Sequence, residues 1–301
     1  MTQDPAAPIR PPARLCMIGL GAMGMPMAAR LKQAGFDVRG ADLSATARTA
    51  FAKTVGAAFE HAAEAAQGAS CAITMLPNSA IVRDALLGSG GVASALPKGA
   101  VVIDMSSSVP TDTVALAADL DRLGLGLIDA PVSGGVKRAI DGSLAIMAGG
   151  PVESIDRVRP VLEAMGKSVF STGPIGSGHA MKALNNYVSA AGLVAACEAL
   201  LVGRRFGLAP ETIVDVLNAS TGRNNSTEVK MKPFVVAEAY NSGFALALMA
   251  KDLRIAADLA AHLDLDAREM AFVADFWERA RDGLAPGADH TEIYRFVDET
   301  A

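Results

Sequence analysis

The segment Leu15-Cys-Met-Ile-Gly19-Leu-Gly21-Ala-Met-Gly24 is the strongest indication of the fold in this chain. It combines an apolar strand, a turn of pattern G-x-G-x-x-G and the start of a helix. Gly19 permits the tight turn, Gly21 lets the backbone approach a pyrophosphate, and Gly24 allows the helix to pack closely on the strand. The segment therefore predicts a dinucleotide site at the N-terminus of a helix, where free N–H groups favour an anion.

Outward from this segment, short apolar runs alternate with helical patterns as far as about Ser171. The predicted strands are Leu15–Ile18, Asp37–Ala41, Cys71–Met75, Val101–Asp104, Leu127–Asp129, Leu144–Ala148 and Ser168–Ser171. Such alternation is typical of a mostly parallel sheet covered by helices on both faces. Beyond about Gly173 only helices are expected, over Gly178–Phe206, Pro210–Ala219, Ala245–Leu263, Ala267–Arg281 and Thr291–Val297.

The expected fold class is therefore α/β, with a second domain that is entirely helical. A chain of 301 residues is long enough for about two domains. A Rossmann-type dinucleotide-binding domain is expected over residues 14–175 and an all-α domain over residues 176–301, joined by a long helix. Residues 1–13, which include four prolines, are expected to form a disordered tail.

Composition excludes several classes of partner. The net charge of −5 gives no electrostatic reason to expect nucleic acid or an anionic membrane. Cys16, Cys71 and Cys197 lie in apolar runs and are expected to be buried thiols in a reducing compartment. The sequence contains no CxxC motif or Cys/His cluster that would indicate a metal site. The very apolar run 187–203 contains Glu198, so a buried helix is favoured over a membrane span.

Asp42 follows the second predicted strand, about 20 residues beyond the glycines. A carboxylate there fits a hydrogen bond to a ribose 2′-OH and would repel a 2′-phosphate, so NAD is favoured over NADP. Arg39 and Arg48 lie close to Asp42 in the sequence, so NADP stays an alternative cofactor. The alternative is that Asp42 only caps the helix beginning near Ser44.

Two further strand ends should border the same cofactor, because ligands of such sheets bind at the carboxyl ends of strands. One is Met75-Leu76-Pro77. The other is the serine run 106–108, whose hydroxyls would reach ribose or nicotinamide unless they cap the helix before Pro110.

A carboxylate site is predicted at Ser133-Gly134-Gly135, which follows the strand ending at Asp129. Successive backbone N–H groups in such a turn form a concave anion nest, for which a small carboxylate is the natural guest. The alternative is an ordinary glycine turn.

Lys182 is the predicted proton donor and acceptor. In the stretch Gly176-Ser-Gly-His-Ala-Met-Lys182-Ala-Leu-Asn-Asn186, the lysine and Asn186 are four residues apart and share one helix face. Hydride transfer to a carbonyl places negative charge on its oxygen, which a nearby ammonium stabilises and protonates. The alternative is a surface lysine, but this stretch carries few other charges.

Four blocks in this order resemble the β-hydroxyacid dehydrogenase family, which includes 3-hydroxyisobutyrate, tartronate semialdehyde and threonate dehydrogenases. They are Ile18–Gly24, Asp129–Gly135, Gly176–Asn186 and Lys251–Leu253. The resemblance implies that Lys182 is catalytic and that Ser133, Gly134, Gly135 and Asn186 hold the substrate. The implied cofactor contacts are Gly19, Leu20, Gly21, Ala22, Met23, Gly24, Asp42, Met75, Leu76, Pro77, Ser107, Phe244 and Lys251.

The expected activity is hydride transfer between NAD(P) and the hydroxyl-bearing carbon of a small 3-hydroxy acid. The resemblance also implies a cytosolic homodimer or homotetramer with the helical domain at the subunit interface. The family often has a bulkier residue where Asn225 stands, which suits a hydroxylated acid if Asn225 lines the substrate pocket.

Three alternatives stay open. An imine reductase of the same architecture usually carries another residue in place of Lys182. A 6-phosphogluconate-type decarboxylating enzyme usually has a longer helical domain and His-Asn-Gly near the lysine. A non-catalytic NAD(P)-binding interaction module would bind the cofactor without turnover.

Overall fold

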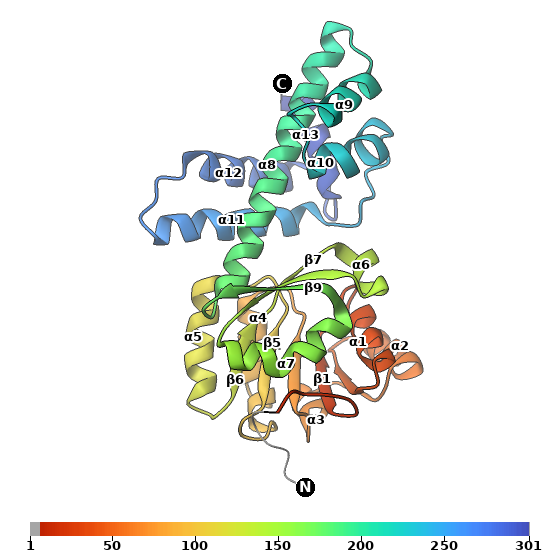
Figure 1. The fold of residues 1–301 in the computed structure, drawn as a ribbon. Coiled ribbons are helices and arrows are strands. Elements are labelled where there is room, and N and C mark those ends of the chain that lie inside the picture. Colours follow the sequence, from red (N-terminus) through yellow and green to blue (C-terminus); the bar gives the residue numbers. More distant parts are fainter. Residues whose placement is uncertain (1–6, 301) are drawn as a thin grey trace. The chain divides into compact units, whose positions relative to one another are not determined.

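The computed structural model describes residues 7–300, which divide into a first unit ending at Lys182 and a second beginning at Ala183 (Figure 1). The boundary predicted from the sequence lies between residues 175 and 176. The division falls inside helix α8 (Ser177–Phe206), because the first turn of α8 is hydrogen-bonded into the first unit.

The first unit is an α/β domain. Its elements are β1 (Arg14–Ile18), α1 (Gly24–Gln33), β2 (Asp37–Ala41), α2 (Ala45–Thr54), β3 (Ala58–Phe59), α3 (Ala62–Ala66), β4 (Cys71–Thr74), α4 (Ser79–Leu87), a 3₁₀ turn (Val92–Ser94), β5 (Val101–Asp104), α5 (Pro110–Asp121), β6 (Gly126–Asp129), β7 (Val132–Ser133), α6 (Gly135–Asp141), β8 (Leu144–Gly149), α7 (Val152–Met165) and β9 (Gly166–Gly173). All seven strands predicted from the sequence are present.

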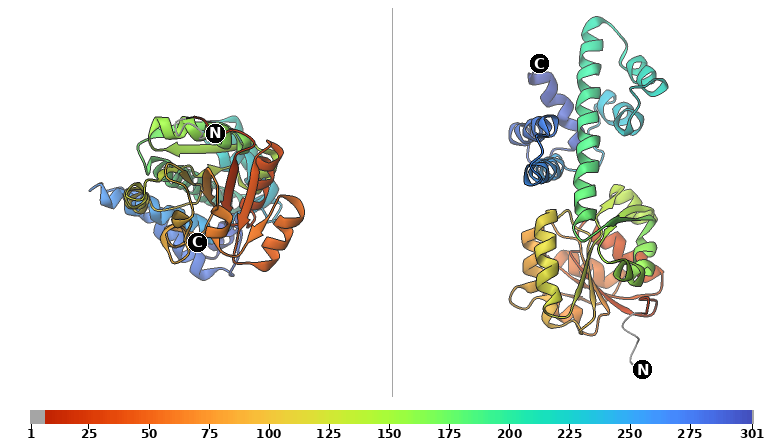
Figure 2. Two further views of the ribbon diagram at one scale, coloured as in Figure 1. Left: turned by 90° about the horizontal axis from the view of Figure 1, so that it is seen from below. Right: turned by 60° about the vertical axis from the view of Figure 1, so that its left-hand side comes forward.

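The two faces of the sheet are covered because successive strand side chains point to opposite sides. In β1, Leu15 and Met17 pack with helices α1, α6 and α7, whereas Cys16 and Ile18 pack with α3, α4 and α5. The right-hand view of Figure 2 shows helices on both faces of the sheet. Strands apolar on both faces are the reason the sequence reads as continuous apolar runs.

The sheet has the order β3-β2-β1-β4-β5-β6-β8-β7 among the described residues, with β9 paired to β8. Strands β3 to β6 along this order are parallel, and β8 is antiparallel to β6 and β7. The order of strands in the sheet switches sides at β1, because β2 and β3 lie on one side of β1 while β4, β5 and β6 lie on the other. Such a switch point opens a crevice at the carboxyl ends of the strands, where ligands bind in this class of fold.

The expected disordered tail covers residues 1–13, of which residues 1–6 lie outside the described part. Within residues 7–13, Ile9 is 5% exposed and packs in the core of the first unit. Its N–H donates to the carbonyl of Arg157 at 2.8 Å. This part of the expected tail is therefore ordered, because an apolar side chain between the prolines finds a place in the core.

The second unit is helical, as expected. It contains α8 from Ala183 onwards, α9 (Pro210–Ala219), α10 (Asn225–Val229), a π-helical turn (Met231–Val236), α11 (Leu246–His262), α12 (Arg268–Gly283), a 3₁₀ turn (His290–Glu292) and α13 (Ile293–Thr300). Helices α11 and α12 lie side by side next to α8 (Figures 1 and 2). The fully buried Trp277 of α12 belongs to the core shared by these helices.

Helix α8 is, among residues 7–300, the one helix long and apolar enough by length and composition to cross a membrane. Half of its most apolar window is buried inside the protein. A core helix of a soluble protein passes the same test of length and composition, so one such helix is weak evidence for a membrane span.

Candidate functional site

The glycine turn between β1 and α1 is packed as tightly as the sequence predicted. Gly19 has φ of 92°, and a Cβ atom there would lie 2.3 Å from the Met75 carbonyl oxygen. A Cβ on Gly24 would lie 1.8 Å from the carbonyl oxygen of Gly19. Any side chain at either position therefore displaces backbone, so these two glycines are required by the fold itself.

Gly21 differs from its neighbours because a Cβ atom there would meet no protein atom within 4 Å. Its φ is not in the left-handed region either. The protein alone gives no reason for a glycine at this position. A ligand backbone or pyrophosphate approaching the turn gives one, and the turn therefore fits a dinucleotide.

Asp42 lies directly after β2 and holds the glycine turn. One carboxylate oxygen accepts from the N–H of Leu20 at 2.7 Å, and the other accepts from the N–H of Ser44 at 2.8 Å. The capping residue of α2 is Ser44, whose hydroxyl accepts from Ala47. A carboxylate has about four acceptor positions, so Asp42 retains capacity for the two hydroxyls of a ribose.

The two arginines that made NADP an alternative cofactor both interact with other groups of the protein. Arg48 donates to the carbonyls of Asp42 and Leu43 and forms an ion pair with Glu60 at 2.9 Å. The Arg39 guanidinium lies over the Phe59 ring at 5.9 Å.

The strand ends at Met75 and Ser106 are tied together by Asp104, which is fully buried. Its carboxylate accepts from the Thr74 hydroxyl, the Ser106 N–H and the Ser108 hydroxyl. The Ser106 hydroxyl accepts from the N–H of Leu76 at 2.9 Å. Neither serine caps α5, whose N-cap is Val109 without a side-chain bond. Ser107 lies between two structural serines on the segment that borders the cofactor edge.

The Ser133-Gly134-Gly135 turn joins β7 to α6. Ser133 pairs with Ala145 of β8, and the two glycines have φ of 131° and 66°. Two successive left-handed residues require glycine at both positions. The Arg138 side chain packs over Gly134, where a Cβ would lie 2.4 Å from Arg138 Cδ.

The start of α8 is anchored by Asp129, which ends β6 and is fully buried. Its carboxylate accepts from the N–H groups of Gly176 at 2.7 Å and His179 at 2.8 Å. A Cβ on Gly178 would lie 2.2 Å from the Met147 carbonyl oxygen. The glycine-rich run therefore allows the close approach that the sequence predicted, and it places the helix that carries Lys182 against the sheet edge.

His179 is the residue that sequence reasoning missed in this region. It is 1% exposed, its Nε2 donates to the Ser106 carbonyl at 3.1 Å, and its Nδ1 lies 2.8 Å from the Thr113 hydroxyl. The ring stands within 4 Å of the carboxylates of both Asp104 and Asp129. It therefore links the first turn of α8 to the serine segment after β5.

Asn186 lies one turn beyond Lys182 on α8 and is held by Asp252, a second residue that was not predicted. The Asn186 amide donates to Asp252 Oδ2 at 2.7 Å, and its carbonyl accepts from Asn185. Asp252 is 2% exposed, and its Oδ1 lies 3.4 Å from the ammonium of Lys251. Asp252 follows Lys251 directly in the sequence, but no local pattern indicated that its carboxylate is buried against Asn186.

Phe244 precedes α11 and packs edge-on against His290, with ring centroids 5.6 Å apart. Its carbonyl accepts from the His290 N–H at 2.8 Å. In the first unit, the structure brings together the glycine turn, Asp42 and the ends of β4 and β5. In the second unit it groups Asn186 with Lys251.

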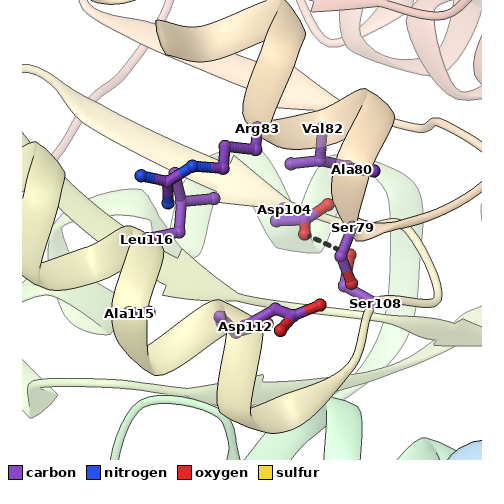
Figure 3. A pocket seen from close by; sticks show the side chains of 10 residues that line it. Ser79, Ala80, Val82, Arg83, Asp104, Ser108, Asp112, Ala115 and Leu116 are labelled. Carbon is purple, nitrogen blue, oxygen red and sulfur yellow. Dashed lines mark hydrogen bonds between the residues drawn. The ribbon is translucent and has the colours of Figure 1, made fainter.

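A pocket of about 350 Å³ lies between α4 and α5 (Figure 3). Its polar lining includes Ser79, Arg83, Asp104, Ser108 and Asp112. None of the glycine-turn residues lines this pocket.

Comparisons with known proteins agree with this arrangement. Residues 14–173 match the family model of the NAD-binding domain of 6-phosphogluconate dehydrogenase. Residues 176–297 match the model described as NAD-binding of NADP-dependent 3-hydroxyisobutyrate dehydrogenase.

Relatives match over most of both chains. The 2-(hydroxymethyl)glutarate dehydrogenase of Eubacterium barkeri is 37% identical over 81% of this chain and 81% of its own. The 3-sulfolactaldehyde reductase of Escherichia coli is 34% identical over 89% and 90%. The structure of Mycobacterium tuberculosis 3-hydroxyisobutyrate dehydrogenase with L-serine superposes with a TM-score of 0.88, at 34% identity over 95% and 99%. The chain belongs to the β-hydroxyacid dehydrogenase family.

Proposed function

We propose that the protein is an NAD-dependent dehydrogenase of small 3-hydroxy acids, acting on a CH–OH group with Lys182 as general acid and base. The observation that carries the proposal is the glycine turn, where Gly21 is exposed and leaves space for a ligand, followed by α8 bearing Lys182 and Asn186 on one face. The relatives named above are dehydrogenases of hydroxy acids and a reductase of an aldehyde, which supports the same chemistry.

The proposed cofactor is NAD. Residues Gly19, Leu20, Gly21, Ala22, Met23 and Gly24 would hold its pyrophosphate, with Met75, Leu76, Pro77, Ser107, Phe244 and Lys251 as further contacts. Asp42 supports NAD over NADP because its free acceptor positions fit ribose hydroxyls, whereas a 2′-phosphate would meet a carboxylate. Arg48 is already paired with Glu60 and supports no phosphate site.

The chemistry proposed for this chain is proton handling. The bound nicotinamide would accept the hydride in oxidation and supply it in reduction. As the carbinol carbon loses hydride, the neutral amine of Lys182 takes the hydroxyl proton, and in reduction the ammonium returns it. Asn186, fixed by Asp252, would orient the substrate beside the lysine, and the Ser133–Gly135 turn would bind the carboxylate.

The proposed setting is a cytoplasmic homodimer or homotetramer. All three cysteines are free and buried. Burial raises the pKa of the Cys16 thiol to about 12, which suits inert core thiols in a reducing compartment.

The test is absorbance at the reduced-nicotinamide band. The purified protein is given NAD or NADP with glycerate, 3-hydroxyisobutyrate, 3-hydroxypropionate, threonate and serine. Reduction of NAD by at least one acid, with slower reduction of NADP, is expected. Cofactor binding without turnover of any acid would contradict the proposal and favour the interaction-module alternative.

A further inference from the structure

Lys230 is a largely buried cation outside the residues used above. It ends α10, and its ammonium donates to the Ser189 hydroxyl of α8 at 3.1 Å. Within residues 7–300, no carboxylate forms an ion pair with it. Burying an ammonium whose hydrogen-bond partner is an uncharged hydroxyl costs free energy, because no paired anion replaces the lost hydration.

The Lys230 contact lies on the face of α8 that carries Lys182 and Asn186. Ser189 follows Asn186 by three residues and Lys182 by seven. At 3.6 residues per turn, seven residues return to within roughly 20° of the same direction, about 10 Å further along the helix axis. The three side chains therefore form one row along α8.

Helix α10 is fixed against this row by two more contacts. The Ser226 hydroxyl donates to the Ser189 carbonyl at 3.2 Å. Gly192 of α8 lets the Asn224 side chain approach, since a Cβ there would lie 3.3 Å from the Asn224 amide nitrogen. Asn225, which the sequence suggested as a pocket residue, is exposed, whereas Lys230 and Ser226 both hydrogen-bond to Ser189 of α8.

The electrostatic environment of Lys230 favours the binding of an additional anion. Burial lowers the pKa of Lys230 to about 8, opposed by attraction from Asp289 and Cys197. The Asp289 carboxylate is already engaged by the hydroxyls of Ser242 and Thr291. His290, the other titratable neighbour, is kept neutral by burial and by Lys230 itself.

We propose that Lys230 and Ser189 bind a second carboxylate of the substrate, so that the preferred substrates are 3-hydroxy dicarboxylic acids. This inference rests on the proposed function, because it places the reacting hydroxyl at Lys182. A single ammonium beside a hydroxyl suits a carboxylate, whereas phosphate sites usually employ arginine or several N–H donors.

The experiment compares 2-(hydroxymethyl)glutarate with 2-(hydroxymethyl)pentanoate, which replaces the distal carboxylate by a methyl group. The wild type, Lys230→Met, Lys230→Arg and the exposed neighbour control Lys232→Met are assayed with NAD. We expect the wild type to prefer the diacid, and Lys230→Met to lower kcat/KM for the diacid about 10- to 100-fold, mainly through KM. The monoacid should change less than about twofold, and Lys230→Arg should keep part of the preference.

Binding of glutarate and pentanoate to each variant is measured by calorimetry in parallel, because neither acid can be oxidised at a hydroxyl. Turnover of neither hydroxy acid would contradict the proposed function, while glutarate binding that depends on Lys230 would still support this site. The inference is overturned if the wild type binds glutarate no more tightly than pentanoate, or if Lys230→Met leaves both the diacid preference and glutarate binding unchanged.

Discussion

Replacing Lys230 by methionine should stabilise the protein at neutral pH. The pKa of this lysine falls from 10.5 to about 8 on folding, and burial is the main cause. Each pKa unit corresponds to about 1.4 kcal/mol, so the buried ammonium costs about 3 kcal/mol below pH 8. Methionine keeps the length of the apolar stem and removes this cost, at the loss of one hydrogen bond to Ser189, which contributes about 1 kcal/mol.

The sign of the pH dependence follows from proton binding. Between pH 8 and pH 10.5 the folded protein holds fewer protons at Lys230 than the unfolded chain, so the free energy of unfolding of the wild type rises with pH in this window. The advantage of Lys230→Met should therefore be about 2 kcal/mol at pH 7 and should disappear as the pH approaches 10.5.

The assay is urea unfolding at several pH values between 7 and 10, at fixed protein concentration. Fluorescence of Trp277 reports on the correct unit, because it is the single tryptophan of the chain and is buried in the helical core. Lys232→Met is the control, since its exposed ion pair with Asp215 contributes about 0–1 kcal/mol. The Lys230→Met protein could instead be less stable than the wild type at pH 7, by an amount that does not vary with pH. This result would show that the buried ammonium does not lower the free energy of unfolding.

Three further predictions address the cofactor turn and the helical core. Gly21→Ala should leave urea unfolding unchanged but weaken NAD binding at least ~10-fold, because only a ligand occupies that space; equal NAD affinity would show that the pyrophosphate lies elsewhere. Asp42→Ala should lower the ratio of NAD to NADP kcat/KM about 10-fold or more, whereas an unchanged ratio would leave Asp42 a purely structural role. The pKa of His290 is lowered to about 4 by burial, so the wild type should lose up to about 3 kcal/mol as pH falls from 6.5 to 4, measured by Trp277 fluorescence. His290→Gln should lose less over that range, and parallel pH profiles for the two proteins would exclude the histidine as the cause.

Local patterns predicted most of the first unit. Strands β1, β4, β5 and β8 are buried along almost their whole length, and the glycine turn needs specific backbone conformations, so both features are determined by consecutive residues. Strands β3 and β7 have two residues each and show no periodicity. The direction of β8 was also not predictable, because an apolar run is the same in parallel and antiparallel strands.

The contacts that position the site could not be read from the sequence. His179 meets Asp104 and Asp129 from 75 and 50 residues away, and Asn186 meets Asp252 across 66 residues. Such pairs depend on how the elements pack, and no local pattern encodes them. Asp42 illustrates a partial success, because its place after β2 was predicted while its bond to the glycine turn was not.

Substitution of Lys182 is the most direct test of the proposed proton transfer. Turnover and NAD affinity are measured for the wild type, Lys182→Ala, Lys182→Arg and the exposed control Lys167→Ala, using the best acid of the panel. Arginine keeps a positive charge but cannot serve as a base, so it separates charge from proton transfer. We predict that both Lys182 variants lose ~10²-fold or more in kcat with NAD affinity nearly intact, while the control is unchanged. Near-normal kcat in Lys182→Ala would contradict the assignment of the proton to Lys182.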